Sequence, residues 1–213
     1  MLNNLTNFFS LITGRQVKTA VEPEDLIVIG TRDPRYGGGY KPSAIKACDL
    51  GSSGGGGIIV LGGGTGSSVR CAAGNTASGY YSTALGSHNT ASSNYTTVGG
   101  GYSNTASGSY STVSGGRSNT ASGKYGTISG GYSNTASGSY SYVFGYANTA
   151  SSNYSTVSNG YCNIASSVYS TVVGGQCNVA SGNKSTVSNG ICNISSNLYS
   201  IVSNGYKNTA SGY

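Results

Sequence analysis

Few of the side chains that usually carry chemistry occur in this sequence. His88 is the only histidine, so a single chain offers no histidine-based dyad, triad or multi-histidine metal site. All five carboxylates precede residue 50, which leaves the rest of the chain without the paired acids of a glycosidase. The glycine runs at 54–57 and 62–66 lack the lysine of a phosphate-binding loop. The sequence therefore predicts a protein that is not an enzyme and has no cofactor or metal.

The cysteines are the remaining candidates for metal binding or cross-linking: Cys48, Cys71, Cys162, Cys177 and Cys192. No pair has the close Cys-x-x-Cys spacing that is typical of a zinc site, but the last three follow one another at a constant spacing. We interpret these three as small reduced side chains, and the alternative is a disulfide or a metal site within their row. The same spacing also recurs throughout the C-terminal part of the sequence.

This recurrence is marked most plainly by asparagine, at Asn75, Asn89, Asn104, Asn119, Asn134, Asn148, Asn163, Asn178, Asn193 and Asn208. The steps between successive asparagines are 14 or 15 positions, and a full unit reads NTASGSYSTVSGGRS (104–118). A period this short cannot hold two helices, but it fits one coil of a parallel β-solenoid. The sequence therefore predicts an all-β parallel β-solenoid with one such unit per coil.

The phase of each residue type within the unit predicts which side chains face inward. Strand side chains alternate between faces, so the asparagine and the alanine two residues later share one face, with the intervening threonine outside. On the second strand, valine and the serine two before it face inward. The expected structural ladders include Asn104, Asn119, Asn134, Ala106, Ala121, Val113 and Val157. We expect hydrogen bonds between stacked asparagines of neighbouring coils to offset the cost of their burial.

Glycine marks the corner of each coil. The usual pair is Gly-Gly, as at Gly115-Gly116, and it becomes Asn-Gly at 159–160, 189–190 and 204–205, which indicates a tight turn with positive φ. The two shorter coils have Gly86 or Gly145 alone, so the length variation is confined to this corner.

Tyrosine forms two rows at the coil period. The first is Tyr81, Tyr95, Tyr110, Tyr125, Tyr140, Tyr154, Tyr169 and Tyr199, interrupted by Lys184. We interpret it as a structural row of stacked rings. The second is Tyr102, Tyr132, Tyr146, Tyr161 and Tyr206, interrupted by Arg117, Gln176 and Ile191. The second row lies beside the corner, so we expect it to be the more exposed and the better candidate for ligand contact.

The remaining sequence divides into two parts. Residues 1–50 hold all the acids and prolines and form the predicted docking segment, with a short apolar helix near the start of the chain and a strand at 26–29. Residues 51–74 are a predicted glycine-rich linker with one short strand, and residues 75–213 form the solenoid. The net charge is +6, but the basic residues of the solenoid occur at scattered phases, which favours solubility over nucleic-acid binding.

Two resemblances bear on function. Units such as ASGYYSTALGSHNTAS (77–92) resemble the head repeats of trimeric autotransporter adhesins of the YadA-like type. That resemblance implies a left-handed parallel β-roll with three chains side by side. The segment LIVIGTRDPRYGGGYKPSAIKACDL (26–50) is similar to N-terminal attachment regions of tailed-phage fibre proteins, particularly those of phages that infect cyanobacteria. It implies docking on a virus particle, for which we expect Phe8, Phe9, Arg32, Arg35, Tyr36 and Tyr40.

Together these features predict a structural fibre of a phage or related virus. We expect a homotrimer, located on the virion and outside the cell, that binds virion tail or baseplate proteins through its N-terminus. Its second partner would be a host surface glycan or protein; nucleic acid and membrane insertion are not expected. A bacterial surface adhesin or extracellular fibril subunit is the alternative. An ice-binding solenoid is a minor alternative, since Thr-x-Ser rows such as Thr105 and Ser107 resemble hydroxyl grids, though Ile164, Val179 and Ile194 interrupt them.

Overall fold

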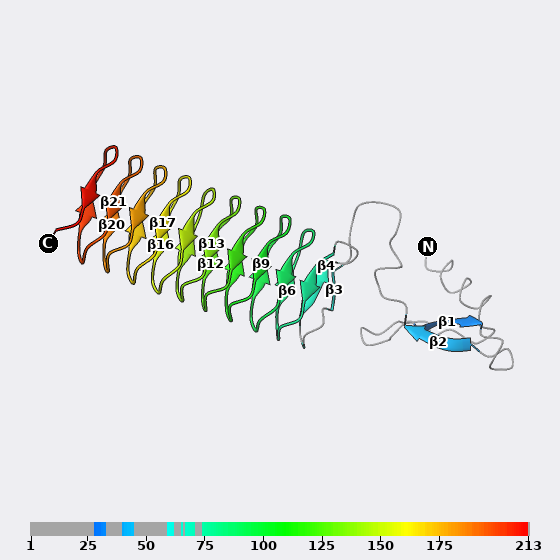
Figure 1. The fold of residues 1–213 in the computed structure, drawn as a ribbon. Helices are drawn as coiled ribbons and strands as arrows, with labels where there is room; N and C mark the ends of the chain where they lie inside the picture. Colours follow the sequence, from blue (N-terminus) through cyan, green and yellow to red (C-terminus); the bar gives the residue numbers. More distant parts are fainter. Residues whose placement is uncertain are drawn as a thin grey trace, which may run out of the picture. The chain divides into compact units, whose positions relative to one another are not determined.

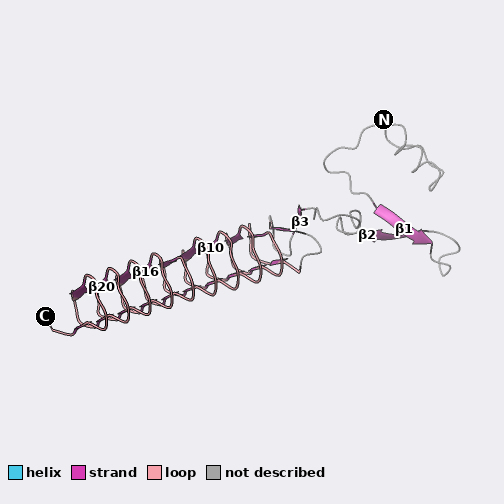
Figure 2. Cartoon of the chain, turned by 90° about the horizontal axis from the view of Figure 1, so that it is seen from above, coloured by secondary structure: helices cyan, strands magenta, loops and turns pink. Residues whose placement is uncertain are grey.

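The repeated part of the chain is a parallel β-solenoid. The computed structural model describes residues 28–32, 40–44, 59–61, 65, 67–70 and 74–212, and the chain divides into two units, Met1–Leu50 and Gly51–Tyr213. In Figure 1 the second unit is a stack of similar coils, and Figure 2 shows the same stack from above. The described residues contain strands and turns but no helix. The predicted all-β solenoid is therefore confirmed.

Each coil contributes one two-residue strand to each of two sheets, which we name after their buried residue. The valine sheet contains β3 (Ile59–Leu61), β4 (Ser68–Arg70), β6 (Thr83–Ala84), β8 (Thr97–Val98), β10 (Thr112–Val113), β12 (Thr127–Ile128), β14 (Tyr142–Val143), β16 (Thr156–Val157), β18 (Thr171–Val172), β20 (Thr186–Val187) and β22 (Ile201–Val202). The alanine sheet contains β5 (Thr76–Ala77), β7 (Thr90–Ala91), β9 (Thr105–Ala106), β11 (Thr120–Ala121), β13 (Thr135–Ala136), β15 (Thr149–Ala150), β17 (Ile164–Ala165), β19 (Val179–Ala180), β21 (Ile194–Ser195) and β23 (Thr209–Ala210).

Strands of successive coils pair in parallel at the sequence period. In the valine sheet Thr112 pairs with Thr127, one full period later, and in the alanine sheet Thr135 pairs with Thr149, across one of the shorter coils. A third row of single parallel bridges runs along the corner, from Ser87 to Tyr206. From Ser87 onward, neighbouring coils are therefore held in register at three places, and the shorter coils keep that register.

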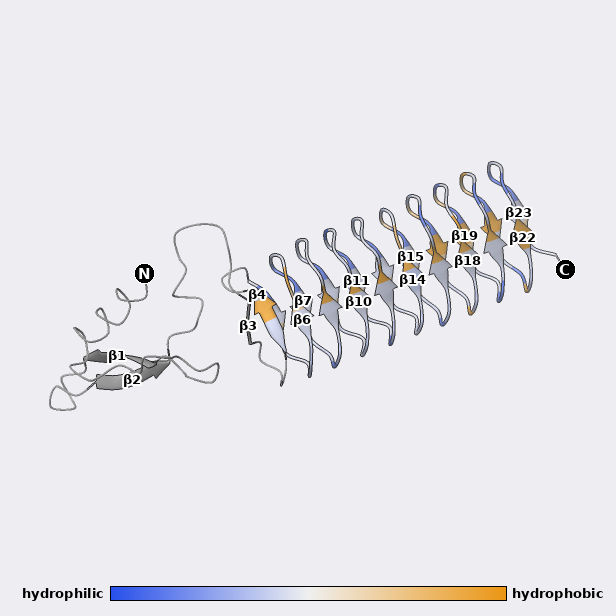
Figure 3. Ribbon diagram, turned by 180° about the vertical axis from the view of Figure 1, so that it is seen from behind, coloured by the Kyte–Doolittle hydropathy of each residue, from blue (hydrophilic) through white to orange (hydrophobic). Residues whose placement is uncertain are grey.

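The core is a thin layer between the two sheets. Alanines of one sheet and valines of the other are almost completely buried, as the alternation of strand side chains requires. Figure 3 shows the hydrophobic residues mainly on the strands and the hydrophilic ones mainly in the turns. The predicted inward positions are confirmed, and the buried residues include Asn104, Asn119, Asn134, Ala106, Ala121, Val113 and Val157.

The buried asparagines form a continuous hydrogen-bonded ladder. The main-chain N–H of Asn119 donates to Oδ1 of Asn104 at 3.0 Å, and that of Asn134 donates to Oδ1 of Asn119 at 2.9 Å. Nδ2 of Asn119 donates to the carbonyl oxygens of Gly115 and Gly131, at 3.1 and 3.0 Å. The predicted hydrogen bonds between coils are therefore present. The bond that repeats along the ladder joins the main-chain N–H of one asparagine to the side-chain oxygen of the asparagine in the preceding coil. Amide-to-amide bonds occur as well, for example from Asn119 to Asn104 at 3.1 Å.

The corner needs glycine for two reasons. Gly116 has a φ of 91°, in the left-handed region, as expected. A Cβ atom there would also meet the carbonyl oxygen of Gly131 and Nδ2 of Asn119. In the shorter coils Gly86 and Gly145 take this same position, with φ values of 89° and 111°. The missing residue therefore comes from the stretch between valine and glycine, which is the corner that the sequence indicated.

The first coil begins earlier than asparagine alone suggests. β4 pairs in parallel with β6, so Ser68 lies beside Thr83 and Val69 beside Ala84. Ser67 is buried, as is Ser82 one period later. β3 then adds an antiparallel strand at this end of the valine sheet, within the predicted apolar strand of the linker. The segment 67–69 therefore repeats the second strand of a coil although no asparagine precedes it at the usual distance.

In the first unit the structure describes one antiparallel pair, β1 (Val28–Arg32) and β2 (Tyr40–Ala44). β1 overlaps the predicted strand at 26–29, whereas the sequence analysis named no strand at the position of β2. The predicted N-terminal helix lies outside the described residues.

Candidate functional site

The tyrosine turn, between the alanine strand and the valine strand of each coil, places one side chain outside, which is a tyrosine in every coil except that of Lys184. In the turn 108–111 the N–H of Ser111 donates to the carbonyl of Gly108 at 2.9 Å. Tyr110 has a φ of 62°, an uncommon value for a residue other than glycine. Its N–H donates backward, to Asn94 of the preceding coil at 2.9 Å, whereas the N–H of Thr112 donates forward to Gly126. The left-handed residue therefore reverses the direction of the hydrogen bonds between coils.

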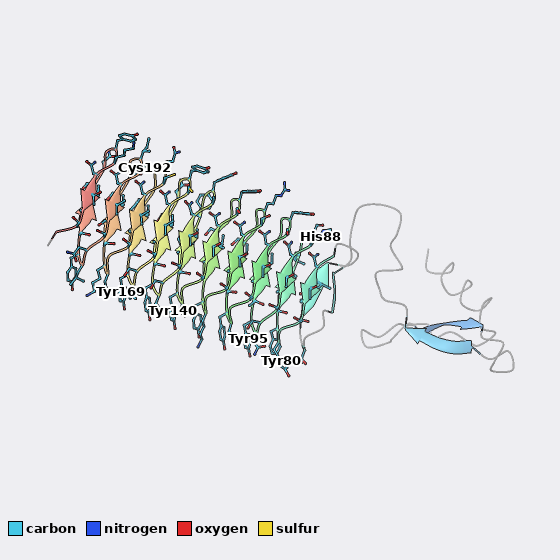
Figure 4. The ribbon with its side chains drawn as sticks, in the orientation of Figure 1. Tyr80, His88, Tyr95, Tyr140, Tyr169 and Cys192 are labelled. Atoms are coloured by element: carbon cyan, nitrogen blue, oxygen red, sulfur yellow. The ribbon has the colours of Figure 1, made fainter. Side chains whose placement is uncertain are left out.

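The rings stack along one edge of the solenoid. This tyrosine ladder comprises Tyr81, Tyr95, Tyr110, Tyr125, Tyr140, Tyr154 and Tyr169, with Lys184 and Tyr199 continuing the row. From Tyr81 to Tyr169, neighbouring ring centroids are 4.8–5.5 Å apart, with interplanar angles of 2–17°. Figure 4 shows Tyr95, Tyr140 and Tyr169 on this edge. Because the ring faces cover one another, the ladder presents ring edges and hydroxyl groups to the solvent.

Lys184 replaces one ring of the tyrosine ladder without breaking it. Its Nζ donates to the Tyr199 hydroxyl at 2.9 Å and lies 4.9 Å from the centre of that ring. The hydrogen bond to Tyr199 raises the pKa of Lys184 above its ordinary value. The ammonium group is therefore charged at neutral pH and exposed on the tyrosine edge.

A second stacked row follows the corner. This corner ladder contains Ser87, Tyr102, Arg117, Tyr132, Tyr146, Tyr161, Gln176, Ile191 and Tyr206. The Cζ atom of Arg117 lies 5.6 Å from the ring centre of Tyr102 and 5.8 Å from that of Tyr132. The rings of Tyr132 and Tyr146 stack at 5.0 Å, and those of Tyr146 and Tyr161 are tilted at 5.1 Å. The basic residue thus continues the stack, with its guanidinium group between two aromatic rings.

Exposure does not separate the two ladders. The predicted contact residues Tyr102, Tyr132, Tyr146, Tyr161 and Tyr206 are 38–62% exposed, and the exposed rings of the tyrosine ladder fall in the range 44–61%. The expectation that the second row is the more exposed one is therefore not met. Both turns project a side chain beyond the sheets. The ladders differ instead in residue type, because the corner ladder includes Arg117, Gln176 and Ile191 among its tyrosines.

The cysteine row lies on the corner edge. Cys162, Cys177 and Cys192 are free thiols that are exposed or half-buried, and each has a positive φ. Figure 4 shows Cys192 and His88 on the edge opposite the tyrosine ladder. Desolvation raises the pKa of the Cys177 thiol, and the adjoining thiols of Cys162 and Cys192 raise it further. The Cys177 thiol is therefore protonated at neutral pH, which makes it a weak nucleophile.

His88 lies next to Ser87, at the beginning of the corner ladder. Its Nδ1 shares a hydrogen bond with Oγ of Ser87 at 2.8 Å, and its ring is tilted against that of Tyr102 at 5.2 Å. No carboxylate lies among the described residues, so within them the Ser87 hydroxyl and not an acid is the partner of this imidazole.

The outer face of the alanine sheet changes along the solenoid. It carries half-buried threonines at Thr90, Thr105, Thr120, Thr135 and Thr149. It then carries Ile164, Val179 and Ile194, of which both isoleucines are about two-fifths exposed. On this face the hydroxyl grid of the ice-binding hypothesis is thus interrupted from Ile164 to Ile194. That hypothesis stays a prediction, to be checked by measuring thermal hysteresis.

The docking candidates are only partly described. Arg32 and Tyr40 face each other as backbone partners at the ends of β1 and β2. Phe8, Phe9, Arg35 and Tyr36 lie outside the described residues. This pairing brings the two ends of the 32–40 segment together. Whether the segment docks on a partner stays a prediction.

The described residues contain neither a cluster of metal ligands nor a membrane-spanning helix. Among the described residues there is no group of three or more histidine, cysteine or acidic side chains that could hold a metal ion. The same residues include no helix with the length and hydrophobicity needed to cross a membrane. Comparison with protein-family models and with curated proteins gave no match for this chain.

Two features of the candidate site were not predicted from the sequence. The left-handed tyrosines were missed because positive φ is usually associated with glycine and asparagine. Arg117 was treated as an interruption of a tyrosine row, although it continues the stack. The available signal was its phase, since Arg117 lies one full period after Tyr102 and one full period before Tyr132.

Proposed function

We propose that this protein is a non-enzymatic structural fibre of a phage or related virus, with the solenoid as its shaft and host attachment as its role. The observation that carries the proposal is the unbroken register from β4 to β22 and from β5 to β23. Each coil adds one strand spacing of about 4.8 Å, so such a chain makes a rod whose length is set by the number of coils. A rod of this kind serves as a spacer between a particle and a surface.

The two resemblances supply the biological setting. The YadA-like repeats are associated with attachment to surfaces, and the phage-like N-terminal segment is associated with docking on a particle. We assign docking to residues 1–50, with Phe8, Phe9 and the 32–40 segment as contacts. An irregular segment can match one partner surface uniquely, whereas a ladder presents the same contact at every coil.

A homotrimer is part of this proposal. The core of one chain consists largely of alanine and valine side chains, and burial of apolar surface contributes only about 25 cal/mol per Å². Ile164 and Ile194 also remain partly exposed on a flat sheet face. Neighbouring chains that cover such surfaces would supply additional burial.

The test is to locate the full-length protein. Purified particles and host cells would be imaged by cryo-electron microscopy with an antibody against the solenoid, and the mass of the free protein would be measured by light scattering. We expect labelled rods on particles and three chains per rod. Labelling confined to a bacterial envelope would support the adhesin alternative instead. Substitution of both Phe8 and Phe9 by alanine should reduce attachment to particles, whereas Tyr110→Phe should not.

A further inference from the structure

Arg117 is a cation held in a fixed position on the corner edge. Its backbone pairs with Tyr102 in the preceding coil and with Tyr132 in the following one. Its guanidinium group lies close to both ring centres, at 5.6 and 5.8 Å. Attraction between a cation and the face of an aromatic ring favours this arrangement on both sides. The side chain is exposed, but the two rings limit its freedom to move.

Among the residues that the structure describes, the guanidinium group has no counter-ion. The sequence contains no aspartate or glutamate after Asp49. Among the described residues, no hydrogen bond or ion pair uses the side chain of Arg117, whose backbone N–H donates to Gly131. A guanidinium group is planar and carries five donors that match the two oxygens of a carboxylate or sulfate. The two rings lie on either side of the guanidinium group, whose donors have no protein partner among the described residues.

We propose that Arg117, together with the hydroxyl groups of Tyr102 and Tyr132, is a binding site for an acidic polysaccharide lying along the solenoid axis. The inference rests on the proposed attachment function and names the class of surface molecule that would be bound. Arg117 pairs with an acidic group of the sugar chain. The two tyrosine hydroxyls, one coil to either side, exchange hydrogen bonds with neighbouring sugar hydroxyls.

The geometry favours an acidic polysaccharide over a neutral one. Neutral sugars usually bind aromatic residues by packing against the ring face, but here the faces of Tyr102 and Tyr132 that meet Arg117 are covered. The other face of Tyr132 is covered by Tyr146. The groups that remain are hydroxyls and one cation, which recognise their ligand through hydrogen bonds and charge.

The spacing of charge argues against nucleic acid. Each strand of a DNA duplex carries one phosphate per ~3.4 Å of the helix axis, and proteins bind nucleic acid with several basic residues in succession. On the corner edge the next basic residue after Arg117 is Lys207, which lies six coils later. One cation among hydroxyl groups matches a polymer with sparse acidic groups and many hydroxyls.

The test measures binding of the full-length protein to immobilised hyaluronan, a carboxylated polysaccharide, at low salt. The decisive variant is Arg117→Gln, which is compatible with the fold because Gln176 occupies the same bridged position three coils after Tyr132. The control is Lys124→Gln, which removes the same charge from the tyrosine edge, where Lys124 lies over the Tyr125 ring at 5.2 Å. We expect Arg117→Gln to weaken binding at least about tenfold, and Lys124→Gln to change it less than about twofold.

Further probes separate fork geometry from charge. Arg117→Lys retains the charge without the planar fork and should bind hyaluronan more weakly than the wild type. Tyr102→Phe and Tyr132→Phe retain the rings without the hydroxyls and should each weaken binding severalfold. Dextran sulfate, which presents sulfate in place of carboxylate, should compete with hyaluronan, and uncharged dextran should not.

Several results would overturn the proposal. These are no binding by the wild type, equal losses in the two glutamine variants, or equal competition by dextran. Tighter binding of a thymidine oligonucleotide through Arg117 would mean that the ligand class is wrong. Failure of the fibre function would look different, because rods would then be missing from particles although hyaluronan binding persisted. Conversely, rods of the Arg117→Gln variant should still join particles.

Discussion

Each coil reverses direction at two turns, and the two are stabilised from opposite sides. The corner is held from inside, by glycine at positive φ and a buried asparagine that bonds to main-chain groups of neighbouring coils. The tyrosine turn is held from outside, by rings that stack in the solvent at 4.8–5.5 Å. Both turns contain left-handed residues, yet only the corner uses glycine for them routinely.

The difference shows in what each turn tolerates. The corner accepts loss of a residue, as at Gly86 and Gly145, but it retains its asparagine in every coil. The tyrosine turn has a constant length but accepts Lys184 in place of a ring. A side chain that must reach fixed main-chain groups cannot be exchanged, whereas one that stacks at the surface can be. The corner therefore requires a particular residue type, asparagine, but tolerates a change of length. The tyrosine turn requires a fixed length but tolerates a change of residue type.

The largest expected effect comes from Asn119→Asp, which changes the corner from inside. Asn119 is fully buried, and its Nδ2 donates to the Gly115 and Gly131 carbonyls. A carboxylate would face those oxygens without donating, at a cost of about 3–5 kcal/mol. Burial raises the pKa of such a carboxyl, so the loss should be smallest below about pH 4 and grow as pH rises and the group ionises. Urea unfolding at several pH values would measure it.

The control for that variant is Asn159→Asp, at an exposed corner position. Oδ1 of Asn159 accepts a hydrogen bond from the N–H of Gly160 at 2.7 Å, and aspartate retains that acceptor. The same change of charge should therefore cost less than about 1 kcal/mol. If Asn119→Asp cost no more than Asn159→Asp, the inside support of the corner would be refuted.

Gly116→Ala and Gly115→Ala compare adjacent positions of one corner. Gly116 has positive φ, and a Cβ there would meet a carbonyl oxygen and an asparagine amide, so we expect a loss of about 3 kcal/mol. At Gly115 nothing lies within 4 Å of the added atom. Since alanine restricts the unfolded chain, Gly115→Ala should be neutral or stabilising by up to about 1 kcal/mol. Thermal unfolding followed by circular dichroism would rank them, and equal losses would contradict the argument.

The interior of the coil was the part that the sequence predicted best. Strand side chains alternate strictly, so the phases of Asn104, Ala106 and Val113 were enough to place all three inside. Glycine at the corner likewise predicted positive φ, because its lack of a Cβ makes that conformation accessible. The trimer, the particle and the receptor stay predictions, because they depend on surfaces of other molecules.

The surface was harder to predict because residue type is a weak guide there. Tyr110 has no intrinsic preference for φ of 62°, and the ladder of neighbouring rings stabilises it. Arg117 looked like a break in a tyrosine row, since its role depends on the rings of two other coils. The start of the solenoid at β4 was missed because asparagine marked the period, and the segment 67–69 repeats only the second strand.

A smaller loss of stability is expected from substitutions of Tyr110, which separate the contribution of ring stacking from the cost of the left-handed conformation. Tyr110 stacks at 4.9 Å on both Tyr95 and Tyr125. Tyr110→Ala loses both contacts and keeps the left-handed conformation, at a cost of about 1–3 kcal/mol. Tyr110→Gly loses the same contacts but removes a left-handed penalty of about 1 kcal/mol, so it should be the milder variant. The reverse order in urea unfolding would show that the left-handed conformation carries no penalty here, and no loss of stability in either variant would show that the rings do not hold the turn.

The smallest effect concerns a hydroxyl group beneath the tyrosine turn. Oγ of Ser155 donates to the Ser152 carbonyl at 2.6 Å and accepts from the Ser152 N–H at 3.3 Å. The equivalent Oγ of Ser111 is buried without a partner. In its coil the N–H of Gly108, the residue equivalent to Ser152, donates instead to Ala121 of the next coil at 3.2 Å. The two coils therefore satisfy the same main-chain donor in different ways.

Substitution of Ser155 and of Ser111 by alanine should therefore change the free energy of unfolding by different amounts. Ser155→Ala should cost about 1 kcal/mol, because it removes a hydrogen bond and leaves the Ser152 N–H unsatisfied. Ser111→Ala should be neutral or slightly stabilising, since it removes a buried polar atom that lacks a partner. Gly126, at the same position in the coil after Ser111, shows that the turn forms without any hydroxyl. Equal losses for the two alanine variants in parallel thermal melts would contradict this assignment, because they would mean that the Ser111 hydroxyl is bonded after all.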